Sequence, residues 1–275
     1  MAIGRHMRVI SRRALVWIAR IGFVGRGIVF LILGAVALAA AVSHQTQPVG
    51  TAGAMNAVVS QPAGGALGLV IAIGVFCFAA LRLIEAFQDI YGYGDDWHGW
   101  LQRGALAAAG VFYLGVGLLG ASIVLTGQYA TDEDVQVRDW TAWALSFPSG
   151  EWLVGIAGVI VAGVGIGLAV AGIRKKFAGR LRRSEEGSRI VIAMGVIGFL
   201  ARSVVFVLIG CFLIFAAWRA NPNEAEGFGG ALQTLRAEPY GNMLLIAAAA
   251  GLLVFGAFGV AEARYGLAAK PRRSG

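Results

Sequence analysis

Two arginines and two glutamates lie inside stretches of apolar sequence. Arg26 falls within GFVGRGIVFLILG, and Arg202 falls at the same place within GFLARSVVFVLIG. Glu85 and Glu262 fall near the ends of two other apolar stretches. An ionisable side chain in the hydrocarbon of a membrane is costly unless it is paired or hydrated. These residues are therefore candidates for buried ion pairs or for the handling of protons, ions or anionic solutes.

The spacing of the glutamates indicates that they occupy equivalent positions of a repeat. Glu85 and Glu262 each stand 23 residues after the proline of a Pro-x-Gly sequence. The two arginines also lie at similar depths in their own stretches. We predict that Arg26 pairs with Glu85 and Arg202 with Glu262, either within each helical hairpin or between the first and third units of the repeat.

A middle copy of the repeat lacks both charges. Ala109 occupies the position that matches Arg26, and Ala171 occupies the position that matches Glu85. Because a lone buried charge is strongly destabilising, their joint loss favours the pairing of arginine with glutamate. Arg82, one helical turn before Glu85, is a competing partner for the Glu85 carboxylate.

Three roles are open for these charges. They can fix the register of the helices as structural ion pairs, they can handle an ion, a proton or a small anionic solute, or the arginines can extend toward water at the membrane surface. No helix is clearly interrupted at the bilayer midplane, where transporters commonly bind their substrates. The sequence therefore favours the structural role over a channel or transporter.

The elements that position these charges follow from the composition. The chain has 275 residues, of which 58% are hydrophobic and 14% are charged. Soluble domains have about 25% charged residues. Its 41 glycines suit membrane helices, which pack closely through small residues. The composition predicts an all-α polytopic membrane protein.

Six stretches are long enough to cross a bilayer, which takes about 20 apolar residues. The first is too long for the apolar region of a signal peptide and belongs to the repeat, so we expect it to be retained. The predicted spans are 16–42, 66–88, 101–126, 152–173, 190–218 and 243–263.

The distribution of basic residues predicts the orientation. Fifteen lysines and arginines lie on the side of the two termini and of the fourth connection, and three lie on the other side. Cytoplasmic segments carry such an excess of positive charge. We therefore expect both termini in the cytoplasm.

The basic fourth connection has two possible ligands. Nucleic acid is disfavoured because features that read a groove are missing, whereas anionic lipid headgroups suffice to explain the charge. The residues expected at the headgroups are Arg174, Lys175, Lys176, Arg180, Arg182 and Arg183.

The odd-numbered spans are copies of one another. An offset of 83 residues aligns the first with the third, and an offset of 176 aligns the first with the fifth. These offsets match Phe30 with Tyr113 and Phe206. Six of thirteen positions are identical between the two stretches quoted above.

The even-numbered spans also repeat, because each follows a Pro-x-Gly sequence: PAG, PSG and PYG. Proline ends the preceding turn, and we expect the glycine to adopt the unusual backbone angles that reverse the chain. Short segments before each proline are expected to form interfacial helices, with Trp140, Trp143 and Phe147 at headgroup depth. The chain is thus predicted to form three tandem helical hairpins with rough pseudo-threefold symmetry.

This pattern resembles a known family. The chain has three tandem two-helix units. The first and third units start with G-F-x-[GA]-R and end in Glu-Ala, and the middle unit departs from this pattern. The arrangement is similar to the bacterial family called Domain of Unknown Function 1206, over about residues 14–266. The resemblance implies a bacterial inner-membrane protein. It implies no activity and no catalytic residue.

Several kinds of site are disfavoured by the sequence. Cys77 and Cys211 have no metal-ligand spacing. The three histidines lie outside the predicted spans, which disfavours a haem between helices. Asp95, Asp96 and His98 are too close in sequence to close a metal site alone. We expect no cofactor, no metal and no enzymatic activity, since no catalytic motif is found.

The sequence predicts that the protein is a structural or interaction bundle in the inner (plasma) membrane. The alternative is a channel or transporter for an ion or small anionic solute. The predicted chain has six parts. The parts are a basic N-terminus (1–15), a first unit (16–92), a second unit (93–173), a basic loop (174–189), a third unit (190–266) and a basic tail (267–275).

Overall fold

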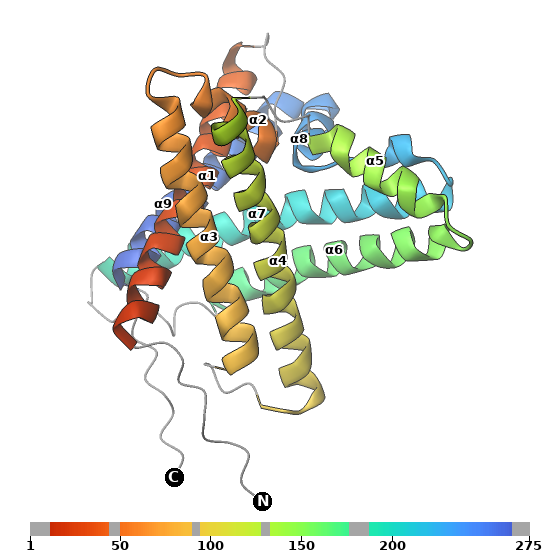
Figure 1. Cartoon of the computed structure of the whole chain (residues 1–275). Coiled ribbons are helices and arrows are strands. Elements are labelled where there is room, and N and C mark those ends of the chain that lie inside the picture. The colour runs from red at the N-terminus through yellow and green to blue at the C-terminus, as the bar shows by residue number, and fades with distance from the viewer. Residues whose placement is uncertain (1–11, 44–49, 90–93, 128–132, 176–186, 266–275) are drawn as a thin grey trace, which may run out of the picture.

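The computed structural model describes residues 12–43, 50–89, 94–127, 133–175 and 187–265, and these residues form helices (Figure 1). Six of the helices are long: α1 (Arg12–Ser43), α3 (Gly64–Gln88), α4 (Trp97–Thr126), α6 (Gly150–Ile173), α7 (Gly187–Trp218) and α9 (Gly241–Tyr265). Each is long and apolar enough to cross a membrane, which confirms the six predicted spans. The protein is therefore an all-α, multi-pass membrane protein.

Four short helices connect the long ones at one end of the molecule, here called the short-helix end. They are α2 (Thr51–Val59), α5 (Glu133–Leu145), the 3₁₀ helix η2 (Pro222–Glu224) and α8 (Phe228–Ala237). The helices predicted before each proline are confirmed as α2, α5 and α8. Trp140, Trp143 and Phe147 are exposed on and just after α5, and their rings contact one another edge to face.

The Pro-x-Gly turns differ from the prediction. The residue between proline and glycine adopts the left-handed backbone conformation, with φ of 64° at Ala63, 64° at Ser149 and 62° at Tyr240. The glycine begins the next long helix instead. A Cβ on Gly64 would collide with the carbonyl oxygen of Val58 in α2, and equivalent collisions occur at the other two turns. Glycine is thus required for close approach of the backbones, not for its dihedral angles.

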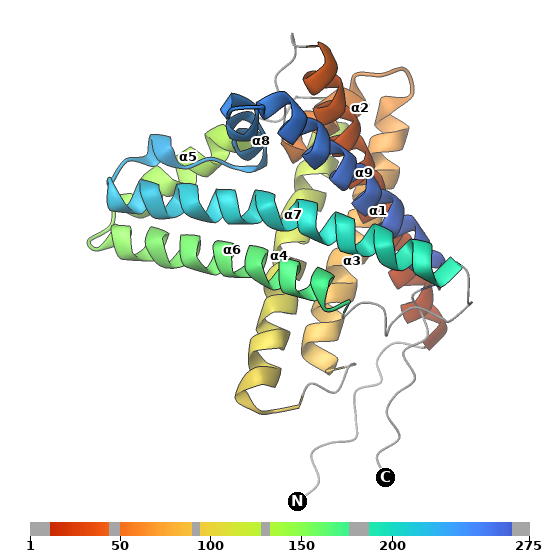
Figure 2. The same cartoon turned by 180° about the vertical axis from the view of Figure 1, so that it is seen from behind.

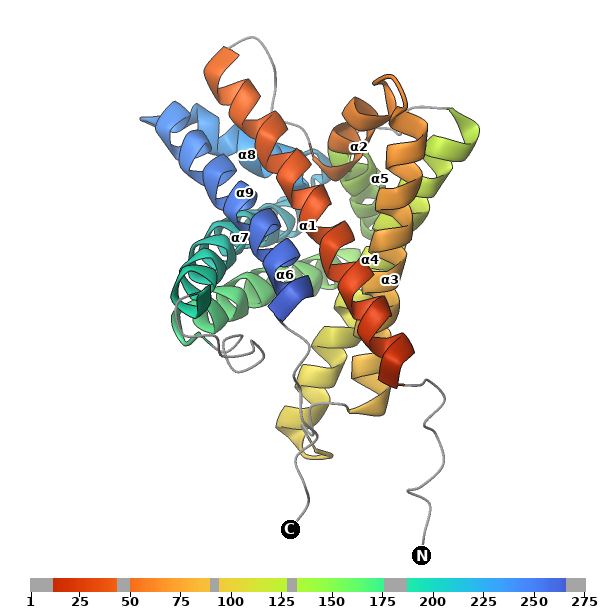
Figure 3. The same ribbon diagram turned by 90° about the vertical axis from the view of Figure 1, so that its left-hand side faces the viewer.

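The long helices form a ring that is open between α4 and α6, and neighbouring repeats are joined by pairs of helices. The pairs between units are α1–α9, α3–α4 and α6–α7, and these are the most extensive helix contacts in the molecule. Figure 3 shows α1 with α9 on one side and α3 on the other. The α6–α7 pair runs across the direction of α3 and α4, as Figures 1 and 2 show.

The contacts between units are equivalent, which confirms the pseudo-threefold arrangement. At matching positions of the repeat, Gly34 packs on Leu253, Gly117 on Phe76 and Gly210 on Ala162. Each odd-numbered helix thus presents a glycine to the same position of an even-numbered helix. Small residues at such crossings let membrane helices approach closely.

The second unit is an open hairpin. Within the first unit, Gly25 of α1 packs directly on the backbone of Gly74 in α3, and within the third unit Ala201 packs on Gly251. The matching residue of α6 is Ile160, which is 60% exposed. Along their described lengths, α4 and α6 hardly touch. The second unit thus has an exposed branched side chain where the other two units have a glycine that lets the helices approach closely.

Candidate functional site

The first ion pair joins the first unit to the third. The Nη2 atom of Arg26 on α1 donates a hydrogen bond to Oε2 of Glu262 on α9, at 2.9 Å, and both side chains are buried. The guanidinium also lies 4.8 Å from the ring centre of Phe78 and 4.9 Å from that of Phe255. Of the two arrangements predicted, the structure therefore has the pair between units.

The second ion pair lies within a single helix. Arg82 donates to Glu85 from one turn away on α3, with 2.6 Å between Nη1 and Oε2. The predicted pairing of Arg26 with Glu85 is wrong, and the competing partner Arg82 takes the carboxylate. Arg82 packs on Phe78, with 4.6 Å from its guanidinium carbon to the ring centre.

Arg202 has no ion pair among the residues that the structure describes, so its predicted pairing with Glu262 is also wrong. The side chain is 9% exposed, and its Nε atom is buried without a hydrogen-bond partner in the protein. Aromatic rings surround the guanidinium instead. The ring centres of Phe206 and Phe30 lie 4.9 and 5.0 Å from its central carbon, and those of Phe255 and Tyr113 lie 5.4 and 5.8 Å away.

The threefold arrangement explains these three outcomes. The Arg position of each odd-numbered helix faces the Glu position of the even-numbered helix in the adjacent unit, as Arg26 faces Glu262. By the same rule, Arg202 on α7 faces position 171 of α6, which is Ala171. Its expected carboxylate is missing.

The same rule applies to Glu85. It faces position 109 of α4, which is Ala109, so its expected arginine is missing. Arg82 replaces that arginine from within α3. The two alanines of the middle unit thus remove one member from each of two ion pairs, rather than removing one complete pair.

A cavity of about 150 Å³ lies beside Arg202 on the pseudo-threefold axis. Two layers of equivalent residues line it, one of them aromatic (Phe30, Tyr113 and Phe206) and one aliphatic (Leu33, Val116 and Ile209). On the short-helix end, Thr51 of α2 and Phe228 of α8 complete the lining.

The cavity has two polar groups without protein partners. The Tyr113 hydroxyl is buried and makes no hydrogen bond, and the side chain is only 5% exposed. Arg202 supplies the other group through its Nε atom. Buried polar groups are normally paired, so two residues that line one cavity and each carry an unpaired donor indicate a binding site for an acceptor.

The sequence analysis did not identify Tyr113 as a site residue. The repeat alignment had matched it with two phenylalanines, and this was the available signal. A hydroxyl at one of three equivalent aromatic positions breaks the symmetry of an otherwise apolar layer.

The predicted lipid contacts fall largely outside the described part of the chain. Arg174 and Lys175 follow α6 and are exposed. The remaining four residues, Lys176, Arg180, Arg182 and Arg183, lie outside the described residues. Contact with anionic headgroups stays a prediction.

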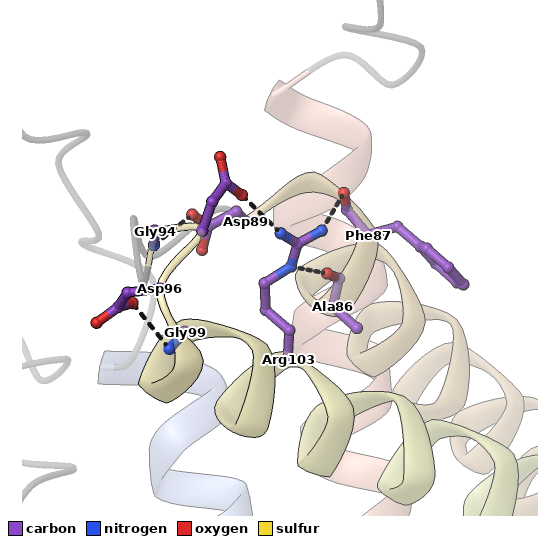
Figure 4. Close-up of polar contacts among 8 residues, drawn as sticks. Ala86, Phe87, Asp89, Gly94, Asp96, Gly99 and Arg103 are labelled. Atoms are coloured by element: carbon purple, nitrogen blue, oxygen red, sulfur yellow. Dashed lines mark hydrogen bonds and ion pairs between the residues drawn. The ribbon is translucent and has the colours of Figure 1, made fainter.

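The polar residues at the start of α4 form a structural connection (Figure 4). Arg103 donates from Nε to the carbonyl of Ala86 at 2.8 Å, near the end of α3, and its Nη1 lies 3.4 Å from Asp95. Asp96 accepts a hydrogen bond from the backbone of Gly99 and so caps α4. Arg103 therefore joins the start of α4 in the second unit to the end of α3 in the first.

Comparisons with known proteins agree with the threefold repeat. A family model described as Domain of Unknown Function (DUF1206) matches three times, at residues 21–89, 104–175 and 197–266. The chain is also 28% identical over 268 residues to the "Uncharacterized protein YxxB" of Bacillus subtilis (strain 168), which covers 95% of this chain and 96% of that protein. No solved structure matches the chain. With matches in all three units, the chain belongs to the DUF1206 family.

Proposed function

We propose that this protein is a non-enzymatic membrane protein that binds a small anionic solute within the bilayer, in the axial cavity beside Arg202. The observation that supports this most is the environment of Arg202: a buried guanidinium, without a carboxylate partner in the described chain, lines a cavity. Ionisable residues inside a membrane commonly mark the path or the site of an ion or solute.

The charge balance supports an anion. Three arginines are buried in the described spans, Arg26, Arg82 and Arg202, against the two glutamates Glu85 and Glu262. The ring of Phe78 packs near the guanidinium groups of Arg26 and Arg82, and the ring of Phe255 packs near those of Arg26 and Arg202. One positive charge is left over, and removal of a charge from water is offset only by a counter-charge or hydrogen bonds.

The structural role favoured by the sequence applies to the other charges. Arg26 and Glu262 join the first unit to the third, and Arg82 with Glu85 neutralises a buried carboxylate. Each of these two carboxylates has an arginine partner within the protein. Our proposal therefore assigns solute handling to Arg202 and helix register to the two pairs.

The excess of basic residues supports placing the chain in the plasma membrane of a bacterium with both termini in the cytoplasm. In that orientation Arg174 and Lys175 would lie at cytoplasmic anionic headgroups. The short-helix end, with α2, α5 and α8, would then face outward.

Benzoate is a suitable probe, because an apolar cavity of about 150 Å³ holds a molecule the size of benzene. We expect saturable binding of benzoate to the purified chain in detergent, measured by calorimetry. Arg202→Gln should weaken binding about tenfold or more, since a hydrogen bond to a charged group contributes about 1.5–3 kcal/mol.

Arg219→Gln is the matched control, because Arg219 is exposed beyond the end of α7. It should bind benzoate like the parent protein. Equal binding by the parent and by Arg202→Gln, or an absence of saturable binding to the folded parent, would overturn the proposal.

A further inference from the structure

We infer that the anion is the head group of a single-chain carboxylate amphiphile, a fatty acid, whose chain enters from the bilayer between α4 and α6. This inference rests on the proposed function, because it identifies the ligand class of the same cavity. Four features of the cavity support it, and they concern its wall, its rims, its opposite end and its polar groups.

The wall of the cavity is incomplete at the second unit. Phe112 and Tyr113 of α4 and Val161 of α6 line the cavity, although α4 and α6 hardly touch along their described lengths. Phe112 is 50% exposed even though it lines the cavity. The cavity therefore reaches the surface of the molecule between these two helices.

The rims of this opening are apolar. Ile160 and Val164 lie on α6 at the positions that pack within the hairpin in the other two units, and both are exposed here. Val111 is exposed next to Phe112 on α4. A hydrated anion finds no hydrogen-bonding side chain among these residues, whereas an acyl chain is compatible with all of them.

The cavity is covered on the short-helix end. Phe228 of α8 is buried and lines the cavity there, opposite Thr51 of α2. On the other side of Arg202, Phe255 packs against its guanidinium. Buried or packed aromatic side chains thus lie at these two places, whereas the lining residue Phe112 is exposed between α4 and α6.

The polar groups fit a carboxylate. Arg202 and Tyr113 both line the cavity, and each has a buried donor without a partner in the protein, the Nε atom of Arg202 and the hydroxyl of Tyr113. A carboxylate has two oxygens and accepts from both. Its hydrocarbon chain would pass Phe112 and leave between Ile160 and α4, in contact with membrane lipid.

The test uses the full chain, purified in detergent, and cis-parinarate, a fluorescent single-chain carboxylate. We expect hexadecanoate to displace it at about tenfold lower concentration than hexanoate, because each buried methylene adds favourable transfer energy. Hexadecanol, which lacks the charge, should displace it poorly. Arg202→Gln should weaken hexadecanoate binding about tenfold, and Tyr113→Phe should weaken it by a smaller factor.

A substitution at the rim of the opening tests the proposed entry route of the acyl chain without changing the anion site at Arg202. Ile160→Trp places a large side chain in the opening without changing a residue that lines the cavity. It should weaken hexadecanoate binding and leave benzoate binding unchanged. Ile166→Trp is the matched control, since Ile166 is exposed on another face of the same helix and does not line the cavity.

The outcomes distinguish the two proposals. If benzoate binds through Arg202 but hexadecanoate binds no better than hexanoate, or Ile160→Trp has no effect, the fatty-acid inference is wrong and the anion site remains. If neither benzoate nor hexadecanoate depends on Arg202, both proposals fail.

Discussion

Arg26 and Glu262 lie 2.9 Å apart although 236 positions separate them in the chain, and their ion pair joins the first repeat to the last. The pair lies on the α1–α9 contact, which is one of the three helix contacts between units. Its two equivalents are incomplete, because the middle unit has Ala109 and Ala171 in place of charges. Because of this asymmetry, Arg202 has no carboxylate partner among the described residues and can bind an anion beside the pseudo-threefold axis.

The Arg26–Glu262 pair should be strongly coupled. Arg26→Ala and Glu262→Ala should each destabilise the protein by about 3–5 kcal/mol, since each leaves an unpaired buried charge. The double variant should recover much of that loss. A double-mutant cycle on unfolding in detergent measures the coupling free energy.

The matched control for this cycle is the exposed pair of Arg219 and Glu224, whose atoms lie 2.8 Å apart. Its coupling should be below about 1 kcal/mol. Equal coupling in the two pairs would show that burial does not strengthen the pair between units.

Ala171→Glu should restore the missing partner of Arg202. The new carboxylate occupies the position that Glu262 has opposite Arg26, so we expect a higher thermal midpoint and loss of benzoate binding. Thermal unfolding and calorimetry on the same sample measure both effects. Ala171→Gln, which adds no charge, is the control, and unchanged benzoate binding by Ala171→Glu would contradict the threefold rule.

Arg82→Ala should destabilise the protein because it removes the partner of buried Glu85. Ala109→Arg supplies the arginine that the repeat predicts opposite Glu85. The combination should therefore be more stable than Arg82→Ala alone, as measured by the midpoint of thermal unfolding. If Ala109→Arg gives no rescue, position 109 does not face Glu85.

The short-helix end should respond to pH through Glu226. Burial, and then the charge of Asp134, raise the pKa of Glu226 above its ordinary value of 4.5, while Arg138 at 3.6 Å opposes the shift. In the folded state the carboxyl holds its proton to higher pH than in the unfolded state. The stability that Glu226 contributes therefore falls as pH rises from 4.5 to the raised folded pKa.

Glu226→Gln should remove this dependence. The variant should match the parent protein below pH 4.5 and have a higher thermal midpoint than the parent at neutral pH, as measured by thermal unfolding across that range. A midpoint that falls at neutral pH would mean that the contact with Arg138 outweighs the burial of the carboxylate.

The local sequence determined the helices and the repeat. Continuous apolar stretches such as 190–218 exclude other structures in a membrane, because every backbone polar group must be satisfied within the segment. The three Pro-x-Gly sequences marked the turns correctly. The role of the glycine there was mistaken, since the collision of its Cβ with the preceding short helix depends on how that helix folds back.

Only the tertiary structure decided which charges meet. From the sequence, Arg26 could reach either glutamate. The position of a residue along its span gives its depth in the membrane, but it does not tell which neighbouring helix the side chain faces. The packing of α1 on α9 fixed that direction, and the same contact in α6–α7 set Arg202 opposite Ala171. The second unit has Ile160 where the other units have glycine, a difference visible in the sequence, but only the tertiary structure shows that α4 and α6 hardly touch.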